Sequence, residues 1–365
     1  MMLKDRVSPS QFFSLLYLSV LSSIFMYISD RRVSVSQTDS LLRPIVFAFV
    51  SILVFLPMGY LMKKYGVFSE EQRKEFSKSK AFKLISLIYG LTYFLDALIT
   101  TARFDLFASS ELFPGKDMTF FLVGLIAVCC FLSHLGLGGL SRASTLFVII
   151  VVSATAFAAL TLFQEVDFLN FTPVFENGAT DFIKDSLFFS VQASEIGAIP
   201  LVVGNIKGNV KKHYILWSIL SAFSFSVVLF FVVGTLGEFA DTQLFPTYSA
   251  ISLAEFGLFE RLDALETAIW ILCIVAKLTF FIYIIVNTFS FSFKKINRHK
   301  IFFSALVGGV ISVILIFVSR NIVRFSFVSS ATVAIGVYVV PVIILPVILI
   351  GVNIMYDRRE KNEKN

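Results

Sequence analysis

Long apolar runs separated by short charged gaps dominate this 365-residue chain. Many of these runs reach about 18 residues or more, which is enough for a helix to cross about 30 Å of hydrocarbon. Mean hydropathy is +0.84 and only 15% of the residues are charged, whereas soluble domains usually carry about 25%. A soluble core cannot absorb so many apolar side chains, so the pattern predicts an all-α integral membrane protein.

We expect about ten transmembrane helices, near residues 9–28, 42–62, 82–103, 118–136, 143–163, 184–204, 213–237, 264–290, 301–319 and 328–353. A cytoplasmic N-terminus then places 21 of the 31 Lys and Arg residues on the cytoplasmic side, nine outside, and Lys277 within a span. Because cytoplasmic loops carry the excess of basic residues, both termini are expected in the cytoplasm. One transmembrane domain is expected over residues 1–356, followed by a charged cytoplasmic tail over 357–365.

Charge, cysteines and motifs argue against several classes of function. The net charge of +6 comes from basic residues beside the spans, which is typical of membrane flanks rather than of nucleic-acid binding. The three cysteines lie inside apolar runs, so we expect buried thiols and no disulfide framework. The sequence contains no H-E-x-x-H or G-x-S-x-G motif, and we expect neither an enzyme nor a metal or cofactor site.

Glu195 lies in the middle of the sixth apolar run, SLFFSVQASEIGAIPLVVG. A carboxylate inside a membrane costs at least a few kcal/mol unless it is paired, protonated or hydrated. Small residues and a proline surround it, namely Ala193, Ser194, Gly197, Ala198 and Pro200. They favour a discontinuous helix whose freed backbone groups face a cavity and can bind a ligand. The alternative is a kinked helix in which Glu195 packs against a neighbour.

Lys277 lies near the middle of the eighth run, where its side chain reaches neither surface easily. A buried lysine either pairs or loses its proton, and Glu195 or Asp96 could be the partner. The alternative is an ion pair with a structural role alone.

The third and first runs also carry polar residues. Tyr89, Tyr93 and Asp96 fall at i, i+4 and i+7, on one face of the third helix, where they could line a cavity; Asp96 could equally lie near the outer interface. The first run carries the serines Ser14, Ser19, Ser22 and Ser23, which could relieve a broken helix or serve ordinary helix packing.

The outer loop 238–263 contains an amphipathic stretch after Pro246, which predicts a short helix lying on the outer surface. The segment LFPTYSAISLAEFGLFERLDALETAIWILCIVAKLTFFIYI begins in this loop and continues through the eighth run. It resembles the corresponding region of the spore germination receptor B-subunit family, of the GerAB type. The matching residues are Phe245, Pro246, Tyr248, Phe259, Glu260, Arg261, Asp263, Ala264, Leu265, Trp270 and Lys277. Glu195 and Pro200 followed by NIKGNVKK, together with VSPSQFF and QTDSLLRP near the start, extend the similarity along the chain.

The resemblance implies a LeuT-type inverted-repeat fold of the amino acid–polyamine–organocation superfamily, with helices one and six broken around a small-molecule site. It also implies a germination receptor A subunit and a C-subunit lipoprotein as partners in the spore inner membrane. Members often carry glycine and proline in helix one, whereas this chain has SVLSSIFMYISD. That difference weakens the case for binding an amino acid through its carboxylate.

We therefore expect a receptor subunit that senses a small, amino-acid-like germinant at a site near the midplane and passes the change to partner subunits. The alternative is a proton-coupled amino acid transporter. The candidate ligand-binding residues are Ser22, Ser23, Tyr93, Asp96, Ser194, Glu195, Gly197 and Lys277.

Overall fold

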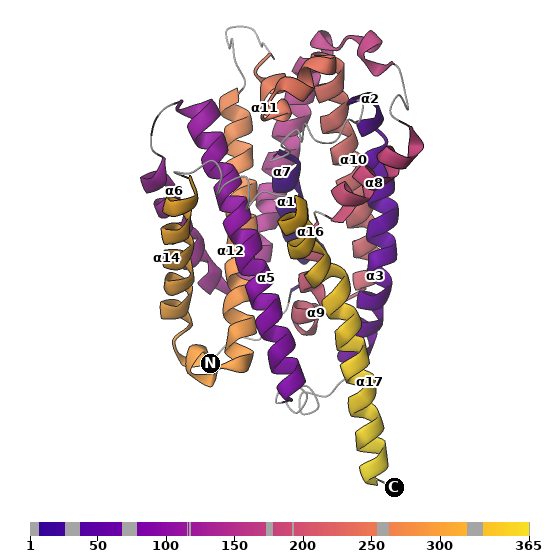
Figure 1. The fold of residues 1–365 in the computed structure, drawn as a ribbon, viewed down its shortest axis with the longest axis vertical. Coiled ribbons are helices and arrows are strands. Elements are labelled where there is room, and N and C mark those ends of the chain that lie inside the picture. The colour runs from indigo at the N-terminus through magenta and orange to yellow at the C-terminus, as the bar shows by residue number, and fades with distance from the viewer. Residues whose placement is uncertain are drawn as a thin grey trace.

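The computed structural model describes residues 7–25, 37–67, 79–114, 116, 118–172, 178–191, 193–253, 263–319 and 331–364. The described part of the chain is a bundle of helices without a β-sheet (Figure 1). Its extended pairing is a single parallel bridge between Val7 and Ile206. The expected all-α architecture is therefore confirmed.

The longer helices cover most of the expected apolar runs. They are α1 (Pro9–Phe25), α3 (Arg43–Val67), α5 (Lys80–Phe107), α6 (Thr119–Leu132), α7 (Gly136–Leu162), α8 (Ala179–Val191), α10 (Val210–Leu236), α12 (Asp263–Ser292), α14 (Lys300–Ser319), α16 (Ala331–Val339) and α17 (Leu345–Lys364). The short elements named below are η2 (Ser133–Leu135), η5 (Ser194–Ala198), α9 (Ile199–Val202), η6 (Val203–Asn205), η7 (Gly237–Thr242), α11 (Pro246–Ile251) and η8 (Val340–Ile344).

Seven stretches of the described chain are long and apolar enough to cross a membrane. One of them, Thr119–Glu165, has 47 residues, which as one helix would be about 70 Å long at 1.5 Å per residue. It is divided by the 3₁₀ turn η2 and by Gly136, whose φ of 70° interrupts the α-helix. We therefore treat α6 and α7 as separate helices.

Two of the expected spans do not form, within the described residues, a helix long and apolar enough to cross a membrane. The first run forms α1, an unbroken helix of 17 residues; residues 26–28 of the expected span lie outside the described residues. The break that the family resemblance implies for helix one is not found between Pro9 and Phe25. The sixth run is interrupted after α8, as the small residues around Glu195 led us to expect.

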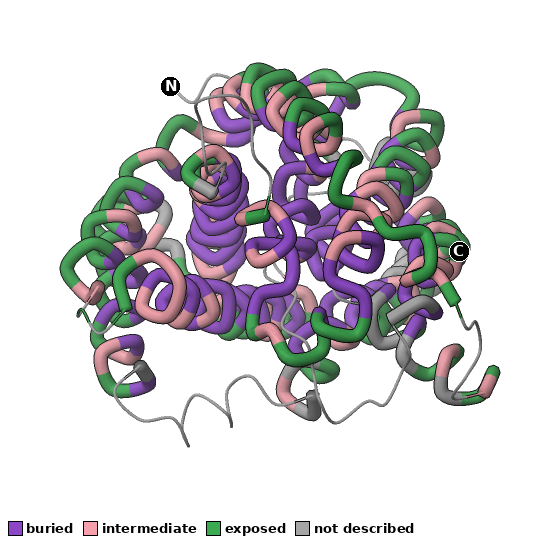
Figure 2. The backbone as a smooth tube through the Cα atoms, turned by 90° about the horizontal axis from the view of Figure 1, so that it is seen from above, coloured by how far each residue is buried: buried purple, intermediate pink, exposed green. Residues whose placement is uncertain are grey.

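Helix α12 lies at the centre of the bundle and packs against α5, α1, α7, α6 and α14. In its most apolar stretch 78% of the residues are buried, against 17% in Thr119–Glu165. The view from above shows buried residues concentrated in the middle and exposed ones around the rim (Figure 2). Large apolar side chains such as Phe120, Leu160 and Phe317 are exposed on that rim, where a bilayer would cover them.

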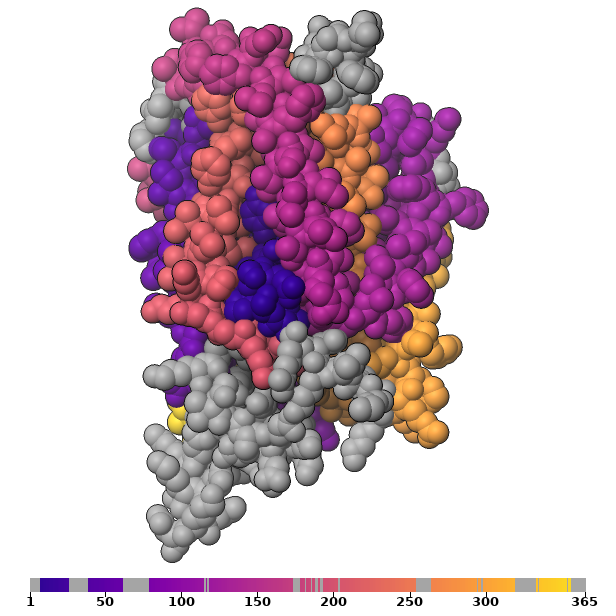
Figure 3. All heavy atoms as spheres, turned by 180° about the vertical axis from the view of Figure 1, so that it is seen from behind, coloured from indigo at the N-terminus to yellow at the C-terminus, as the bar shows by residue number. Residues whose placement is uncertain are grey.

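Helix α1 lies between α10 and α7, and the view from behind shows it in the gap between them (Figure 3). Its N-terminal end is bonded to the segment that follows α9. Val7 donates a backbone hydrogen bond to Asn205 at 2.9 Å and accepts one from Lys207 at 3.0 Å. The start of α1 and the end of the interrupted sixth run are thus held together.

The short helix expected after Pro246 exists as α11, near the end of the bundle opposite the C-terminus, and most of its residues are buried against the bundle (Figure 1). Pro246 and Tyr248 are buried, and Tyr248 packs edge-to-face on Phe107 at 5.2 Å. Phe245 and Trp270 complete an aromatic cluster around Phe107. Burying these rings removes apolar surface from water, which holds α11 against the bundle. Residues 254–262 of the loop lie outside the described residues.

The remaining expectations concern the cysteines and the C-terminus. Cys129, Cys130 and Cys273 are buried free thiols, as predicted. Helix α17 continues from its apolar half to Lys364, so the charged tail that we expected from residue 357 prolongs this helix through residue 364.

The close contact between α5 and α12 depends on Gly90. A methyl group there would lie 2.5 Å from Cε2 of Phe289 and 2.8 Å from Oγ1 of Thr288, whereas one at Gly124 would meet nothing within 4 Å. We predict that Gly90→Ala lowers the free energy of unfolding by about 1–3 kcal/mol, the usual cost of overpacking, and that Gly124→Ala does not lower it. Thermal unfolding of the purified variants in detergent measures both; equal stability of the two would contradict the prediction.

Candidate functional site

The interruption of the sixth run places a short irregular segment inside the bundle. Helix α8 ends at Val191, Ala193 leaves the helical region with ψ of 61°, and η5 continues as a 3₁₀ turn into α9. Every residue of η5 is buried. Pro200 has no backbone N–H and cannot extend the helical ladder backward, so the sequence itself disfavours a continuous helix here.

Glu195 and Lys277 form an ion pair at the centre of this region. Nζ of Lys277 lies 3.1 Å from Oε1 of Glu195, and both side chains are almost fully buried. Ser19 donates a hydrogen bond of 2.9 Å to the same carboxylate oxygen, and Lys277 donates one of 2.7 Å to Oγ of Ser23. Three elements, α1, η5 and α12, therefore meet through four side chains.

Asp96 extends the network to α5. The hydroxyl of Ser194 donates a short hydrogen bond to Oδ2 of Asp96, and Tyr93 donates one of 3.0 Å to the backbone carbonyl of Ser194. Tyr89 stacks on Tyr93 with 6.4 Å between the ring centroids. The expected polar face of the third helix is thus confirmed, and Asp96 is buried in the bundle rather than placed at the outer interface.

Two acceptors in this network remain available. Oε2 of Glu195 and Oδ1 of Asp96 are buried and have no hydrogen-bond partner among the described residues. Tyr338 of α16 is also buried, within electrostatic range of Asp96, Glu195 and Lys277. Because a buried acceptor without a partner costs free energy, the site is suited to receive a proton or a donor group such as an ammonium.

Gly197 allows the two irregular segments η5 and η8 to pack closely against each other. A methyl group at Gly197 would lie 2.5 Å from the backbone carbonyl oxygen of Pro341 in η8. Backbone cannot move aside as a flexible side chain can, so only glycine fits this position without a shift. The structure thus gives Gly197 a packing role beside the ion pair.

The network contains six of the eight candidate residues: Ser23, Tyr93, Asp96, Ser194, Glu195 and Lys277. Ser22 does not join it, because its hydroxyl donates to the carbonyl of Ser19 within α1 at 2.7 Å. Sequence reasoning named Ser19 among the serines of the first run but did not make it a candidate ligand-binding residue, and it did not name Tyr338. Ser19 precedes Ser23 by four residues, the spacing that places two side chains on one helix face, and this signal could have identified it.

The site has no constellation for holding a metal. Among the described residues, no group of three or more His, Cys, Asp and Glu side chains is close enough to bind an ion.

Comparison with known proteins gives two matches. A family model described as spore germination protein matches residues 6–321. The chain YfkT of Bacillus subtilis (strain 168), whose given name assigns it provisionally to spore germination, is 25% identical over 281 residues. That alignment covers 74% of this chain and 77% of YfkT.

The ion pair predicts a non-additive pattern of mutant stabilities. Lys277→Met and Glu195→Gln each leave one buried partner without its counterpart, and each should lower the free energy of unfolding by about 3–5 kcal/mol. The double variant removes both charges and should lose clearly less than the sum. Thermal unfolding in detergent measures this, with Lys116→Met, an exposed lysine, expected to stay within about 0.5 kcal/mol of the native chain. Additive losses would contradict a direct pair.

Proposed function

Because this chain belongs to the family of spore germination proteins, we propose that it is the membrane subunit of a germination receptor and not an enzyme. In this proposal it senses a small, amino-acid-like nutrient germinant at the site formed by α1, α5, η5 and α12. The observation that carries the proposal is the buried Glu195–Lys277 pair at an interrupted helix. Ionisable groups at membrane depth are costly to keep and usually mark a ligand or ion site.

The proposed architecture has ten membrane helices in a LeuT-type arrangement. They are α1, α3, α5, α6, α7, the interrupted segment from α8 to η6, α10, α12, α14 and the segment from α16 to α17. The buried 3₁₀ turn η5 beside α1 supports this arrangement, since such transporters bind their substrates at discontinuous helices. The charge asymmetry of the loops supports cytoplasmic termini, and the family supports the spore inner membrane as the location.

A receptor of this kind works by a shift between two conformations. A germinant that binds one arrangement of α1, η5 and α12 more tightly than another will shift the population toward it. We propose that an A subunit and a C-subunit lipoprotein read this shift.

A proton-coupled amino acid transporter is the second candidate. The available carboxylate oxygens of Asp96 and Glu195 favour it, because a proton could bind there during a transport cycle. Uptake by vesicles that contain this chain alone separates the two functions. Robust accumulation of an amino acid would support transport, and germinant-dependent signalling without accumulation would support the receptor.

We predict that Glu195→Ala slows the germinant response by about tenfold or more. A tenfold change corresponds to about 1.4 kcal/mol. The physical reason is that the variant removes the acceptor for Lys277 and Ser19. The measurement is the germination rate of spores that carry matched A and C subunits, at protein levels checked by immunoblot. Glu238→Ala, which alters an exposed glutamate on η7, is the control. A normal response of Glu195→Ala at normal abundance would show that Glu195 has a structural role alone.

From the position of Lys277 we also predict that germinant affinity does not depend on sodium. In sodium-coupled LeuT-type proteins a cation lies between helices one and eight, and here Nζ of Lys277 bonds to Ser23 between α1 and α12. Two unit charges about 4 Å apart repel by about 4 kcal/mol at an effective dielectric constant near 20, so an ammonium here excludes sodium. Germinant affinity should be unchanged when potassium or choline replaces sodium at constant ionic strength and pH. An affinity that rises steeply with sodium alone is the contrary result.

A further inference from the structure

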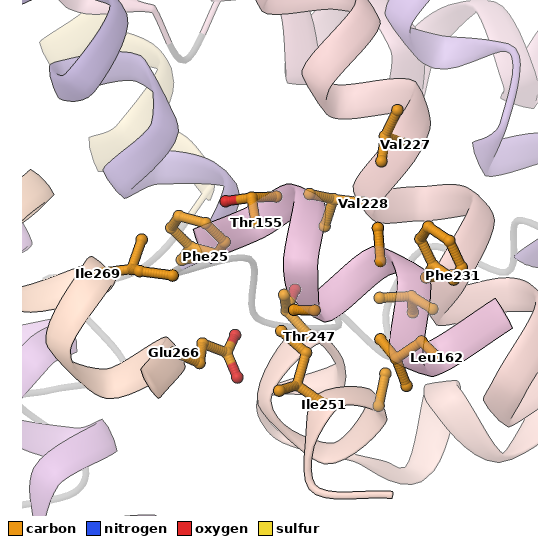
Figure 4. A pocket seen from close by; sticks show the side chains of 14 residues that line it. Phe25, Thr155, Leu162, Val227, Val228, Phe231, Thr247, Ile251, Glu266 and Ile269 are labelled. Atoms are coloured by element: carbon orange, nitrogen blue, oxygen red, sulfur yellow. The ribbon is translucent and has the colours of Figure 1, made fainter. Parts of the chain in front are cut away.

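The described structure holds spaces of very different size away from the ion-pair network. The pocket lined by Phe25, Leu162 and Ile269 (Figure 4) has a volume of about 30 Å³, which is room for little more than one water molecule. Another space, of about 410 Å³, is an open groove between α6 and α14. These two helices lie side by side at the edge of the bundle (Figure 1). Of the two spaces, the groove alone is large enough for an organic ligand.

The groove has a buried floor and an exposed, mostly apolar rim. Side chains from both helices form the floor, namely Ile126, Cys130, Ser304, Gly308 and Ser312. Gly308 brings the helices together there, because a methyl group at this position would collide with Sγ of Cys130. The rim consists of Val123, Ala127, Phe131, Ile301, Ala305 and Gly309. The floor is therefore accessible from the side on which a bilayer would lie.

The polar atoms of the floor are already bonded within the two helices. Ser312 donates a hydrogen bond to the carbonyl of Gly308 at 2.9 Å, and Ser304 donates one to the carbonyl of Ile301 at 3.0 Å. The thiol of Cys130 donates one to the carbonyl of Ser304 at 3.3 Å. The floor thus offers an occupant apolar contact, which suits a hydrocarbon chain better than a second helix held by interhelical hydrogen bonds.

The length of the groove matches one leaflet of a bilayer. From Ile301 to Ser312 the helix α14 advances eleven residues, which is about 16 Å and close to half of a hydrocarbon core of about 30 Å. Gly309 keeps the groove open along this length, because a methyl group there would meet nothing within 4 Å. An acyl chain along the floor would begin at the membrane surface near Ile301 and end near the bilayer centre.

Basic side chains lie at the end of the groove that Ile301 marks. The segment 293–300, FKKINRHK, carries four Lys and Arg residues and no acidic residue. Lys295 and Arg298 are exposed on the short helix α13 (Lys294–Arg298), and Arg298 precedes Ile301 by three residues. Guanidinium and ammonium groups form strong, charge-assisted hydrogen bonds with phosphate oxygens. This end of the groove is therefore suited to an anionic headgroup.

We propose that the groove between α6 and α14 binds an anionic phospholipid, with one acyl chain along its floor and the phosphate on Lys295 and Arg298. The apolar floor and the basic end match the two parts of such a lipid, and Lys and Arg clusters beside membrane helices attract anionic headgroups. Both α6 and α14 pack against α12, which carries Lys277. A bound lipid would therefore stabilise the packing around α12, whatever the identity of the germinant.

The test compares dioleoyl phosphatidylglycerol with dioleoyl phosphatidylcholine, which have the same acyl chains and differ in the net charge of the headgroup. Native mass spectrometry of the purified full-length chain in detergent counts the bound lipids and gives their dissociation constants. The anionic lipid should bind at least about tenfold more tightly, because two basic residues attract its headgroup. The double variant Lys295→Gln/Arg298→Gln should lose this preference and still bind the zwitterionic lipid. Lys211→Gln/Lys212→Gln, which removes two exposed lysines at the start of α10, should keep it.

A second variant tests the groove independently of the charge. Gly309→Leu should weaken binding of both lipids by about tenfold, because its side chain takes the space of the acyl chain. Gly336→Leu is the control, since an added methyl group at this exposed position of α16 also meets nothing within 4 Å. Thermal unfolding in detergent confirms that each variant is folded.

Three results would overturn the proposal: equal affinity of the native chain for the two lipids, an unchanged preference in Lys295→Gln/Arg298→Gln, or unaffected binding in Gly309→Leu. A dimer in the native mass spectrum that Gly309→Leu dissociates would also overturn it, because a second copy of the chain would then occupy the groove. None of these variants alters the Glu195–Lys277 site, so the outcome is independent of the proposed germinant response.

Discussion

The ion pair between Glu195 and Lys277 is the interaction on which the centre of this protein depends. Hydrocarbon offers neither group a substitute for water, so each charge is tolerable only while the other stays within reach. The two residues lie on η5 and α12, and the serines that bond to them belong to α1. Relative movement of any of these three elements therefore changes the energy of the pair. The hydrogen bond between Ser194 and Asp96 brings α5 under the same constraint.

Two interrupted helices support this centre from one side. The 3₁₀ turn η5 contacts the π-helical turn η8, where Gly197 faces the carbonyl of Pro341. Each interruption leaves backbone groups outside the regular ladder, and at membrane depth such groups are tolerated only where protein or a cavity covers them. Placing the two irregular segments against each other covers both. The network is thus built where the helices are least regular, which gives short side chains such as Ser194 access to the core.

The sequence identifies the residues that are unusual for a membrane helix. It does not show which of them contact one another in the folded protein. Glu195, Asp96 and Lys277 stand out because an ionisable group in an apolar run is costly, and all three belong to the network. The choice of Glu195 over Asp96 as partner of Lys277 depends on relative depth and rotation of three separate helices, which periodicity within each helix does not encode. Gly197 packs closely against the backbone of Pro341. Because Pro341 lies about 140 positions away in the sequence, the residues around Gly197 could not reveal this role. The packing of α11 on the bundle was not predicted for a similar reason, because the aromatic partners Phe107 and Trp270 lie in other helices.

Under the proposed function, the same geometry would link ligand binding to movement. Separating α1 from η5 and α12 would remove Ser19 from Glu195 and Ser23 from Lys277, and the pair would need replacement partners. A ligand that carries hydrogen-bond donors can supply them to Glu195 and Asp96, each of which already has one carboxylate oxygen without a partner in the described structure. Binding would then lower the cost of an arrangement that is otherwise disfavoured, which is the differential affinity that a shift in population requires. In that proposal the central site would need no large pocket in the resting protein, because the free energy gained from ligand binding would offset the free energy needed to separate the helices.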